Sequence, residues 1–285
     1  MNNILVTGGN GQLGSELKEL VPNYPDYNFL FTDVSDLDIK AHNETREFII
    51  SNNINTIINC AAYTDVDKAE SEPELADAIN HLAVANFAKI AKEKNIKLIH
   101  ISTDYIFDGT SDKPYVETDK PNPKSIYGKT KLDGELAIQA INPVNSIIIR
   151  TSRVHSKNGN NFVNTMLRLA ETIDEISVVD DQIASPTNAS DLAKAILTIL
   201  PNISNKTVEV FHYSNEGVCS WYDFAKAIFE VEGIAIKVNP IESKQYLTPA
   251  DRPFYSVLNK GKIKDVYQIK ILNWRKSLNN NLNDF

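Results

Sequence analysis

A glycine-rich turn directly after the first apolar run constrains the fold of this chain more than any other feature. Ile4-Leu5-Val6 leads straight into the segment 7–14, and an amphipathic pattern starts at about Gln12. Two glycine spacings are satisfied at once: Gly9-x-Gly11-x-x-Gly14 and Gly8-x-x-Gly11-x-x-Gly14. Glycines at such positions permit a tight turn, close backbone approach to a pyrophosphate and close packing of helix on strand. The pattern therefore predicts a strand–turn–helix unit whose helix N-terminus binds phosphate groups.

A carboxylate after the second apolar run extends this prediction to a whole dinucleotide. Phe29-Leu30-Phe31 ends at Asp33, which can accept a hydrogen bond from the 2′-hydroxyl of an adenosine ribose. A carboxylate repels a 2′-phosphate, so Asp33 favours NADH over NADPH. Lys40 or Arg46 folding back toward that phosphate would favour NADPH. We therefore expect NADPH or NADH as the cofactor.

Apolar runs alternate with helical patterns through the first half of the chain. The runs are residues 4–6, 29–31, 56–60, 97–101 and 146–150. The helical patterns cover about 12–20, 45–51, 73–90 and 126–141. Near-continuous apolar strands between helices are typical of a parallel sheet that is covered on both faces. We expect an α/β fold with a Rossmann-like, doubly wound parallel sheet.

The second half breaks this alternation. Residues 151–187 and 213–285 mix short helices, proline-containing loops and isolated strands, whereas 189–200 reads as a helix and 208–212 as a strand that could return to the first sheet. We expect a dinucleotide-binding domain of residues 1–150 plus about 188–212. Residues 151–187 and 213–285 would form a smaller, discontinuous α/β lobe for the substrate, with a cleft between the two.

Composition excludes several classes of function. The chain of 285 residues has 29 Lys and Arg against 37 Asp and Glu, a net charge of −8. This balance disfavours binding to nucleic acid or to an anionic membrane surface. Cys60 and Cys219 are too few and too far apart for a disulfide framework or a zinc cluster. With no signal-peptide pattern and no membrane-spanning apolar run, we expect a cytoplasmic protein.

A tyrosine and a lysine stand four residues apart in Tyr127-Gly128-Lys129-Thr130-Lys131. On a helix they share a face, and a nearby ammonium lowers the pKa of a phenol. Such a tyrosine can protonate a carbonyl oxygen, and the lysine can also bind the nicotinamide ribose. Tyr222 and Lys226 repeat the spacing inside an apolar helical pattern, which we interpret as ordinary core packing.

The strand before Tyr127 distinguishes the two copies. Residues 99–104 form an apolar run that ends in Ser102, Thr103 and Asp104. Open α/β sheets bind ligands at the carboxyl ends of their strands. The Thr103 hydroxyl could therefore polarise the same carbonyl that Tyr127 protonates.

These motifs together resemble the extended short-chain reductases that act on nucleotide sugars, and among them the dTDP-4-dehydrorhamnose reductases. The resembling segments run in the family's order over nearly the whole chain. They are residues 11–14, 61–64, 66–70, 102–107, 127–131, 159–162, 181–182, 186–187, 248–250 and 252–253.

The resemblance implies a role for each matching residue. The pyrophosphate would lie on Gly11, Gln12 and Leu13, the adenosine ribose on Asp33, and the adenine beside Asp38 and Ile39. Ala62, Tyr63 and Thr64 would line the nicotinamide side, and Gly8, Gly14 and Ala61 would complete the cofactor site. Thr103 and Asp104 would contact the sugar, Tyr127 would be the general acid, and Lys131 its partner and a ribose ligand.

Two positions depart from the family's pattern. Arg153 stands where the family usually has a tryptophan that packs on the sugar, and His155 where it commonly has tyrosine. Arg153 would bind the nucleotide pyrophosphate, or else be an exposed or salt-bridged surface residue. Arg252 is a second candidate for the diphosphate, because a guanidinium suits bidentate phosphate contact, unless it pairs locally with Asp251. We expect no metal.

The resemblance implies reduction of dTDP-4-dehydro-6-deoxy-L-mannose to dTDP-L-rhamnose by hydride transfer from NAD(P)H, for surface polysaccharide. An epimerase or dehydratase of another nucleotide sugar is less favoured, because Thr103 is followed by Asp104-Tyr105 rather than by an acidic pair. A non-catalytic regulatory subunit, of the kind that binds methionine adenosyltransferase, would not need Thr103, Tyr127 and Lys131 together. We expect a monomer or a homodimer.

Overall fold

The computed structural model describes residues 2–283, and its centre is a six-stranded, fully parallel sheet in the order β10-β5-β4-β3-β1-β2. These strands are β1 (Asn2–Thr7), β2 (Tyr27–Thr32), β3 (Thr56–Asn59), β4 (Lys97–Thr103), β5 (Ser146–Thr151) and β10 (Glu209–His212). Each expected apolar run forms one of them, and β10 pairs with β5 at the sheet edge. The order of the strands reverses between β1 and β3, the point where ligands bind in open sheets.

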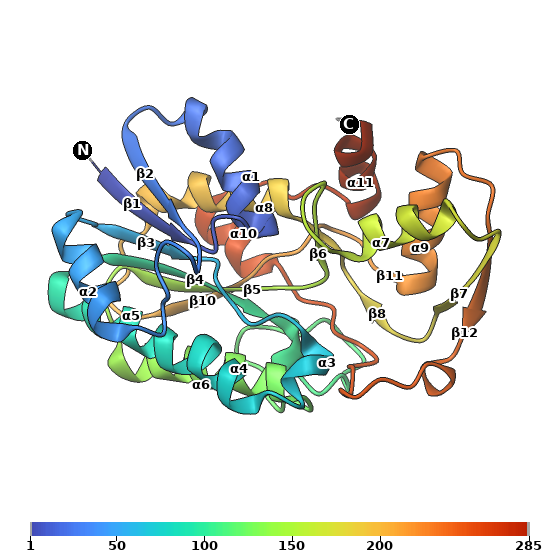
Figure 1. The fold of residues 1–285 in the computed structure, drawn as a ribbon, viewed down its shortest axis with the longest axis horizontal. Helices are drawn as coiled ribbons and strands as arrows, with labels where there is room; N and C mark the ends of the chain where they lie inside the picture. Colours follow the sequence, from blue (N-terminus) through green and yellow to red (C-terminus); the bar gives the residue numbers. More distant parts are fainter. Residues whose placement is uncertain (1, 284–285) are drawn as a thin grey trace.

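Helices cover both faces of this sheet (Figure 1). The helices of the chain are α1 (Gln12–Leu20), α2 (His42–Ser51), α3 (Val66–Ala69), α4 (Pro73–Asp77), α5 (Ala83–Lys94), α6 (Ile126–Ile141), α7 (Phe162–Ala170), α8 (Ala189–Ile199), α9 (Trp221–Val231), α10 (Gly261–Tyr267) and α11 (Trp274–Asn283). One apolar core joins the sheet to α1, α8 and α10, and a second joins its other face to α2, α5 and α6. The expected doubly wound fold is confirmed.

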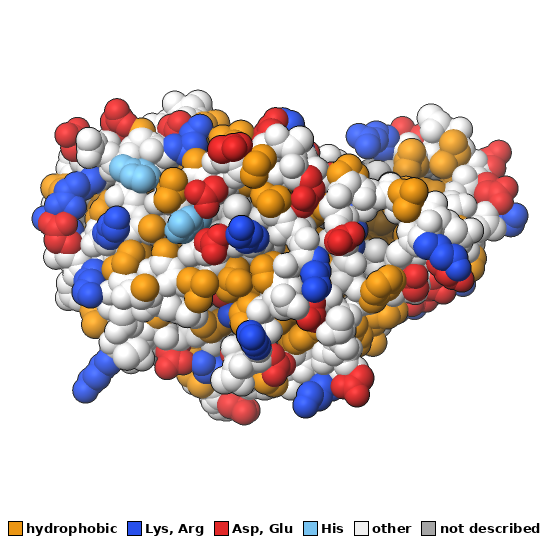
Figure 2. Space-filling view, turned by 90° about the horizontal axis from the view of Figure 1, so that it is seen from below, with side chains coloured by type: hydrophobic (Ala, Val, Ile, Leu, Met, Phe, Trp, Pro, Cys, Tyr) orange, Lys and Arg blue, Asp and Glu red, His pale blue; other side chains and the backbone are white. Residues whose placement is uncertain are grey.

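A smaller lobe lies beside the carboxyl edge of the sheet (Figure 1). Its short strands are β6 (Val154–His155), β7 (Glu175–Val179), β8 (Ile183–Ala184), β9 (Thr187–Asn188), β11 (Cys219–Ser220) and β12 (Lys237–Ile241). A separate core packs α7, α9 and α11 against β7 and β12. Figure 2 shows the larger body and this lobe side by side, with charges of both signs interspersed over the visible face.

The helix expected over residues 73–90 is not continuous. It is split into α4 and α5 by a π-helical segment, Ala78–Leu82. Asn80 in that segment is fully buried, accepts a hydrogen bond from the backbone N–H of Tyr63 at 2.9 Å and donates one to the carbonyl of Tyr63 at 3.1 Å. The spacing of apolar residues predicts only which face of a helix is buried. The wider π-helical turn places the buried Asn80 amide where it can pair with backbone polar groups of a neighbouring loop.

No described helix is both long and apolar enough to span a lipid bilayer.

Candidate active site

The glycine turn connects β1 to α1 as its spacing predicts. Gly8 has φ +65°, and a Cβ there would lie 2.8 Å from the backbone nitrogen of Ala61. A Cβ on Gly14 would lie 2.3 Å from the carbonyl oxygen of Gly8, so only glycine allows the helix to begin this close to the turn. Gly11 is the N-cap of α1, and no side chain within residues 2–283 caps the first N–H groups of this helix. Those donors are therefore free for a phosphate group.

Asp33 is tied to the same turn. It directly follows β2, and its Oδ2 accepts a hydrogen bond from the backbone N–H of Asn10 at 3.0 Å. Its Oδ1 accepts from the N–H of Val34 at 2.8 Å. Lys40 forms a 3.4 Å ion pair with Asp38, whereas Arg46 is held by Glu93 in a bidentate pair. Of the two cations considered above for a 2′-phosphate, Lys40 alone lines the cavity described next.

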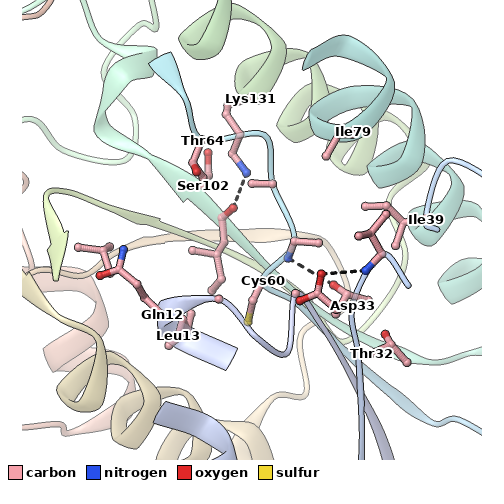
Figure 3. Close-up of a pocket in the computed structure, with 18 of the residues that line it drawn as sticks. Gln12, Leu13, Thr32, Asp33, Ile39, Cys60, Thr64, Ile79, Ser102 and Lys131 are labelled. Atoms are coloured by element: carbon pink, nitrogen blue, oxygen red, sulfur yellow. Dashed lines mark hydrogen bonds between the residues drawn. The ribbon is translucent and has the colours of Figure 1, made fainter. Parts of the chain in front are cut away.

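A cavity of about 410 Å³ runs along the carboxyl edge of the sheet, a volume within the usual range of small-molecule sites. Figure 3 shows Gln12 and Leu13 on one side, Asp33 and Ile39 on another, and Lys131 extending into it from above. Gln12 Oε1 and Thr32 Oγ1 are buried and have no hydrogen-bond partner among the described residues. Two unsatisfied polar atoms in the wall indicate a polar ligand, because buried polar groups are normally paired.

Helix α6 places Tyr127 at this cavity. Ser125 caps the helix by accepting a hydrogen bond from the N–H of Gly128 at 3.1 Å. A Cβ on Gly128 would lie 2.3 Å from the carbonyl oxygen of Tyr105, so this glycine allows α6 to lie close to the end of β4. The Tyr127 ring packs edge-on against that of Tyr105, with ring centroids 5.6 Å apart, and Thr103 is close enough to lower the pKa of the Tyr127 hydroxyl.

The environment of Tyr127 changes one expectation. Burial raises the pKa of Tyr127, and the nearby Thr103 opposes that shift only in part. We expected the Lys131 ammonium to lower it, but Nζ donates instead to the carbonyl oxygen of Ile101 at 2.6 Å. Desolvation of the phenolate outweighs a cation whose hydrogen bond is directed elsewhere. The tyrosine therefore keeps its proton at neutral pH.

Lys131 is buried among groups of several kinds. Lys131 is only 2% exposed. Glu135 lies one turn further along α6, and Cys60 directly follows β3. Burial lowers the pKa of Lys131 to about 8, while the negative charge of Glu135 opposes the shift. Glu135 forms a buried ion pair with Arg150 at 2.7 Å, which screens that charge.

Asp104 is almost fully buried beside Thr103. Its Oδ2 accepts a hydrogen bond from Ser152 Oγ at 2.7 Å, and its Oδ1 accepts one from Thr103 Oγ1 at 3.2 Å. Burial raises the pKa of the Asp104 carboxyl, and hydrogen bonds from Ser256 and Ser152 oppose this. These contacts orient Thr103 relative to Tyr127.

Arg153 is neither exposed nor salt-bridged to a described carboxylate. Its guanidinium lies 4.1 Å from the ring centre of Trp221 and donates to the carbonyls of Gln182 at 2.8 Å and Cys219 at 3.1 Å. Its φ of +47° is unusual for a non-glycine residue. Arg153 stands where the family usually has tryptophan, and Trp221 of α9 places an indole ring against the Arg153 guanidinium.

Arg252 pairs with Asp67 rather than with Asp251. The two hydrogen bonds from its guanidinium to the Asp67 carboxylate measure 2.7 and 3.0 Å. They tie the loop 246–256 of the smaller lobe to α3 of the larger one. The pKa of the Asp67 carboxyl is lowered, chiefly by this hydrogen bond.

Comparison with known proteins decides the family. The model of the RmlD substrate binding domain matches residues 1–285. A dTDP-4-dehydrorhamnose reductase from Sinorhizobium fredii is 42% identical over 282 residues, which cover 96% of this chain and 94% of the relative. The chain belongs to the dTDP-4-dehydrorhamnose reductase family.

Two solved structures of this family superpose on nearly the whole chain. A dTDP-4-dehydrorhamnose reductase from Clostridium acetobutylicum is 40% identical with a TM-score of 0.93, covering 99% of this chain and 98% of its own. One from Bacillus anthracis, solved in complex with NADP, is 36% identical with a TM-score of 0.95 and covers 100% of both chains. The fold and family expected from the sequence are therefore confirmed.

In this reductase family member, most of the predicted cofactor residues lie on the cavity wall. They are Gly8, Gly11, Gln12, Leu13, Asp33, Asp38, Ile39, Ala61, Ala62, Thr64, Tyr127 and Lys131. Gly14 packs behind the turn. Tyr63 does not line the cavity. Its hydroxyl donates a hydrogen bond to Glu72 at 2.8 Å. Thr103, Asp104, Arg153 and Arg252 also lie outside the cavity wall, toward the smaller lobe.

Sequence reasoning missed other residues of the wall. They include Thr7, Thr32, Leu37, Cys60, Ile79, Ile101, Ser102, Thr151, Val154 and Leu192. Several directly end or follow a strand of the parallel sheet. The rule that ligands bind at carboxyl edges could have identified these.

One group of potential metal ligands lies outside the cavity. Atoms of Asp77, His81 and Asp133 all lie within 4.8 Å of one another. His81 Nδ1 is already 2.9 Å from Asp77 Oδ1, so a hydrogen bond accounts for part of this cluster. The expectation of no metal stays a prediction.

Proposed function

We propose that this protein reduces dTDP-4-dehydrorhamnose to dTDP-L-rhamnose with hydride from NADPH or NADH. The observation that carries the proposal is the position of Tyr127 beside Lys131 in the wall of a cavity that opens onto an uncapped helix N-terminus. That arrangement supplies an acid for a ketone oxygen and a site for a diphosphate within one cleft.

The residues of the cavity fit a nicotinamide dinucleotide. The free N–H groups of Gln12 and Leu13 would hold its pyrophosphate. The unpaired Gln12 Oε1 and Thr32 Oγ1 would accept hydrogen bonds from donor groups elsewhere on the dinucleotide. Asp33 would bind the adenosine ribose, and Lys131 the nicotinamide ribose. When bound in reduced form, the nicotinamide supplies the hydride.

Tyr127 is the general acid of the reaction. Burial raises its pKa, so Oη carries a proton that it can donate to the C4 oxygen of the sugar. Thr103, whose hydroxyl donates to Asp104, would align the ketone. Lys131 stabilises the phenolate that remains, because an opposite charge nearby favours the ionised form.

Arg153 and Arg252 set the substrate side of the cleft. Arg252 holds Asp67 through both terminal nitrogens, and Arg153 donates to two backbone carbonyls. The remaining N–H groups of each guanidinium would bind the diphosphate of the nucleotide sugar. We propose accordingly that residues 151–187 and 213–285 bind the sugar nucleotide, and that residues 1–150 with 188–212 bind the cofactor. The protein would act in the cytoplasm as a monomer or a homodimer, without a metal.

The assay mixes the protein with dTDP-4-dehydrorhamnose and either NADPH or NADH, and follows the loss of near-ultraviolet absorbance of the reduced nicotinamide. We expect turnover with this sugar and formation of dTDP-L-rhamnose. Turnover only with a different nucleotide 4-keto sugar would contradict the substrate, and a tightly retained, recycled oxidised cofactor would favour an epimerase or dehydratase instead.

A further inference from the structure

A row of buried polar side chains crosses the sheet behind the cavity. Thr7, Asn59 and His100 are register partners on the adjacent strands β1, β3 and β4. All three are at most 1% exposed. The row ends at Lys131, whose Nζ lies 3.4 Å from His100 Nε2.

The hydrogen bonds of this row have a direction that the backbone sets. The N–H of Ala61 points to Thr7 Oγ1 at 3.4 Å, and Thr7 Oγ1 donates to Asn59 Oδ1 at 2.7 Å. The amide nitrogen Nδ2 of Asn59 is then left facing His100 Nδ1 at 3.0 Å. If Asn59 turned over, the Thr7 proton would lose its acceptor in a buried site, which is costly.

This direction fixes the tautomer of His100. An Nδ1 that accepts from Asn59 carries no proton, so the neutral ring is protonated on Nε2. That N–H points at Lys131 Nζ. A neutral amine can accept it while donating its own N–H to the carbonyl of Ile101, whereas an ammonium has only donors to present.

We propose that His100 is a positioning residue that holds down the proton affinity of Lys131, through a hydrogen-bond chain that begins at the backbone of Ala61. The inference rests on the role given above to Lys131. It adds that the lysine is set to gain and lose its proton close to physiological pH, so that its charge responds to what occupies the cavity.

The other groups around Lys131 do not replace this effect. Glu135, from α6 itself, raises the proton affinity of the lysine and is neutralised by Arg150 of β5. The thiol of Cys60, after β3, stays protonated because burial raises its pKa to about 12. Tyr127, one turn earlier on α6, keeps its proton as well. Burial together with the charge of Lys131 lowers the pKa of His100, so its ring is neutral.

The test titrates Lys131 in the protein without cofactor or sugar. The ¹³Cε chemical shift of Lys131, in protein labelled at lysine, reports its pKa, and the ring ¹⁵N shifts of His100 report the tautomer. His100→Asn removes the nitrogen that faces Nζ. We expect the pKa of Lys131 to rise by about one unit, the size of one net buried hydrogen bond. The wild-type ring should show a protonated Nε2.

Two further variants separate this effect from a loss of packing. Thr7→Val keeps the shape of the side chain and removes its hydrogen bonds with Asn59 and Ala61. It should raise the same pKa by releasing Asn59. His155→Asn makes the same substitution at a buried histidine of β6 and should leave the Lys131 titration unmoved.

Three results would overturn the proposal: a protonated Nδ1 in the wild type, a Lys131 pKa that falls or stays constant in His100→Asn, or an equal rise in His155→Asn. Because no reactant is present, each outcome is independent of whether the protein reduces the proposed sugar. The pH profile of kcat gives a second measurement, since its alkaline limb should move upward with the pKa of Lys131.

Discussion

At the residue scale, the proposed reaction assigns the chemistry to Tyr127 and Thr103, and their burial determines how they would act. A tyrosine with a raised pKa is a weaker acid but remains protonated at neutral pH, so its proton is available to the more basic alkoxide that forms on the carbonyl as hydride arrives. Thr103 is 5% exposed, which keeps its hydrogen bond to Asp104 away from competing water.

Replacement of Tyr127 by Phe tests this role. We expect kcat to fall by roughly 10²- to 10⁴-fold, the usual contribution of a positioned acid, with a small change in KM. Steady-state kinetics would measure both. Tyr222→Phe, at the second Tyr-x-x-x-Lys on α9, is the matched control and should keep normal turnover. Equal losses in the two variants would contradict the assignment.

The ion pair of Arg252 with Asp67 leads to a second prediction about single residues. The side chains are 23% and 34% exposed, so the bond adds little to stability, but it fixes where the guanidinium lies. For Asp67→Asn we expect a several-fold rise in KM for the sugar nucleotide and an unchanged kcat. An unchanged KM would show that Arg252 needs no such anchor.

At the scale of elements, the start of α1 determines whether the pyrophosphate of the cofactor can bind. Gly14→Ala would place a Cβ 2.3 Å from the carbonyl of Gly8, so the turn and helix must separate. We expect at least a tenfold weaker cofactor affinity, measured by quenching of protein fluorescence.

Gly233→Ala is the control for that variant. Gly233 has φ +66°, and no neighbouring atom of the described part of the chain lies within 4 Å of an added Cβ. It should cost stability of about 1 kcal/mol through backbone strain alone, with no change in cofactor affinity. A similar loss of affinity in both variants would mean that global destabilisation, not the turn, is responsible.

The elements also show what sequence alone predicts and what it does not. Helix 126–141 and the five apolar strands were predictable, because burial on both faces leaves continuous apolar runs. The π-helical break at 78–82 was not, since it depends on a buried amide, Asn80, meeting a distant loop. The pairing of Arg252 with Asp67 depends likewise on contacts between distant segments. The glycine, tyrosine and lysine motifs predicted part of the cavity wall, whereas the direction of the Lys131 side chain required the packed structure.

At the scale of the whole molecule, buried histidines make stability depend on pH. Burial lowers the pKa of His155 to about 4 and that of His212 to about 3. These values lie below the value of about 6.5 expected in the unfolded chain. The unfolded state therefore binds more protons as pH falls below about 6.5, and folding becomes less favourable down to the folded-state values.

His155→Phe tests this dependence. The ring lies 5.1 Å from that of Phe224, so an apolar ring can replace it. Between about pH 6.5 and 4 we expect the wild type to lose on the order of 3 kcal/mol more stability than the variant. Urea unfolding at several pH values measures this, and parallel curves for the two proteins would contradict it.

The whole account depends on hydride reaching C4 of the sugar from a bound nicotinamide. Incubation of the protein with dTDP-4-dehydrorhamnose and NADPH carrying deuterium at the transferable position of the nicotinamide tests this directly, with the product read by mass spectrometry and proton NMR. We predict one deuterium in dTDP-L-rhamnose, located at C4. A product without deuterium, or with the label at another carbon, would contradict the account.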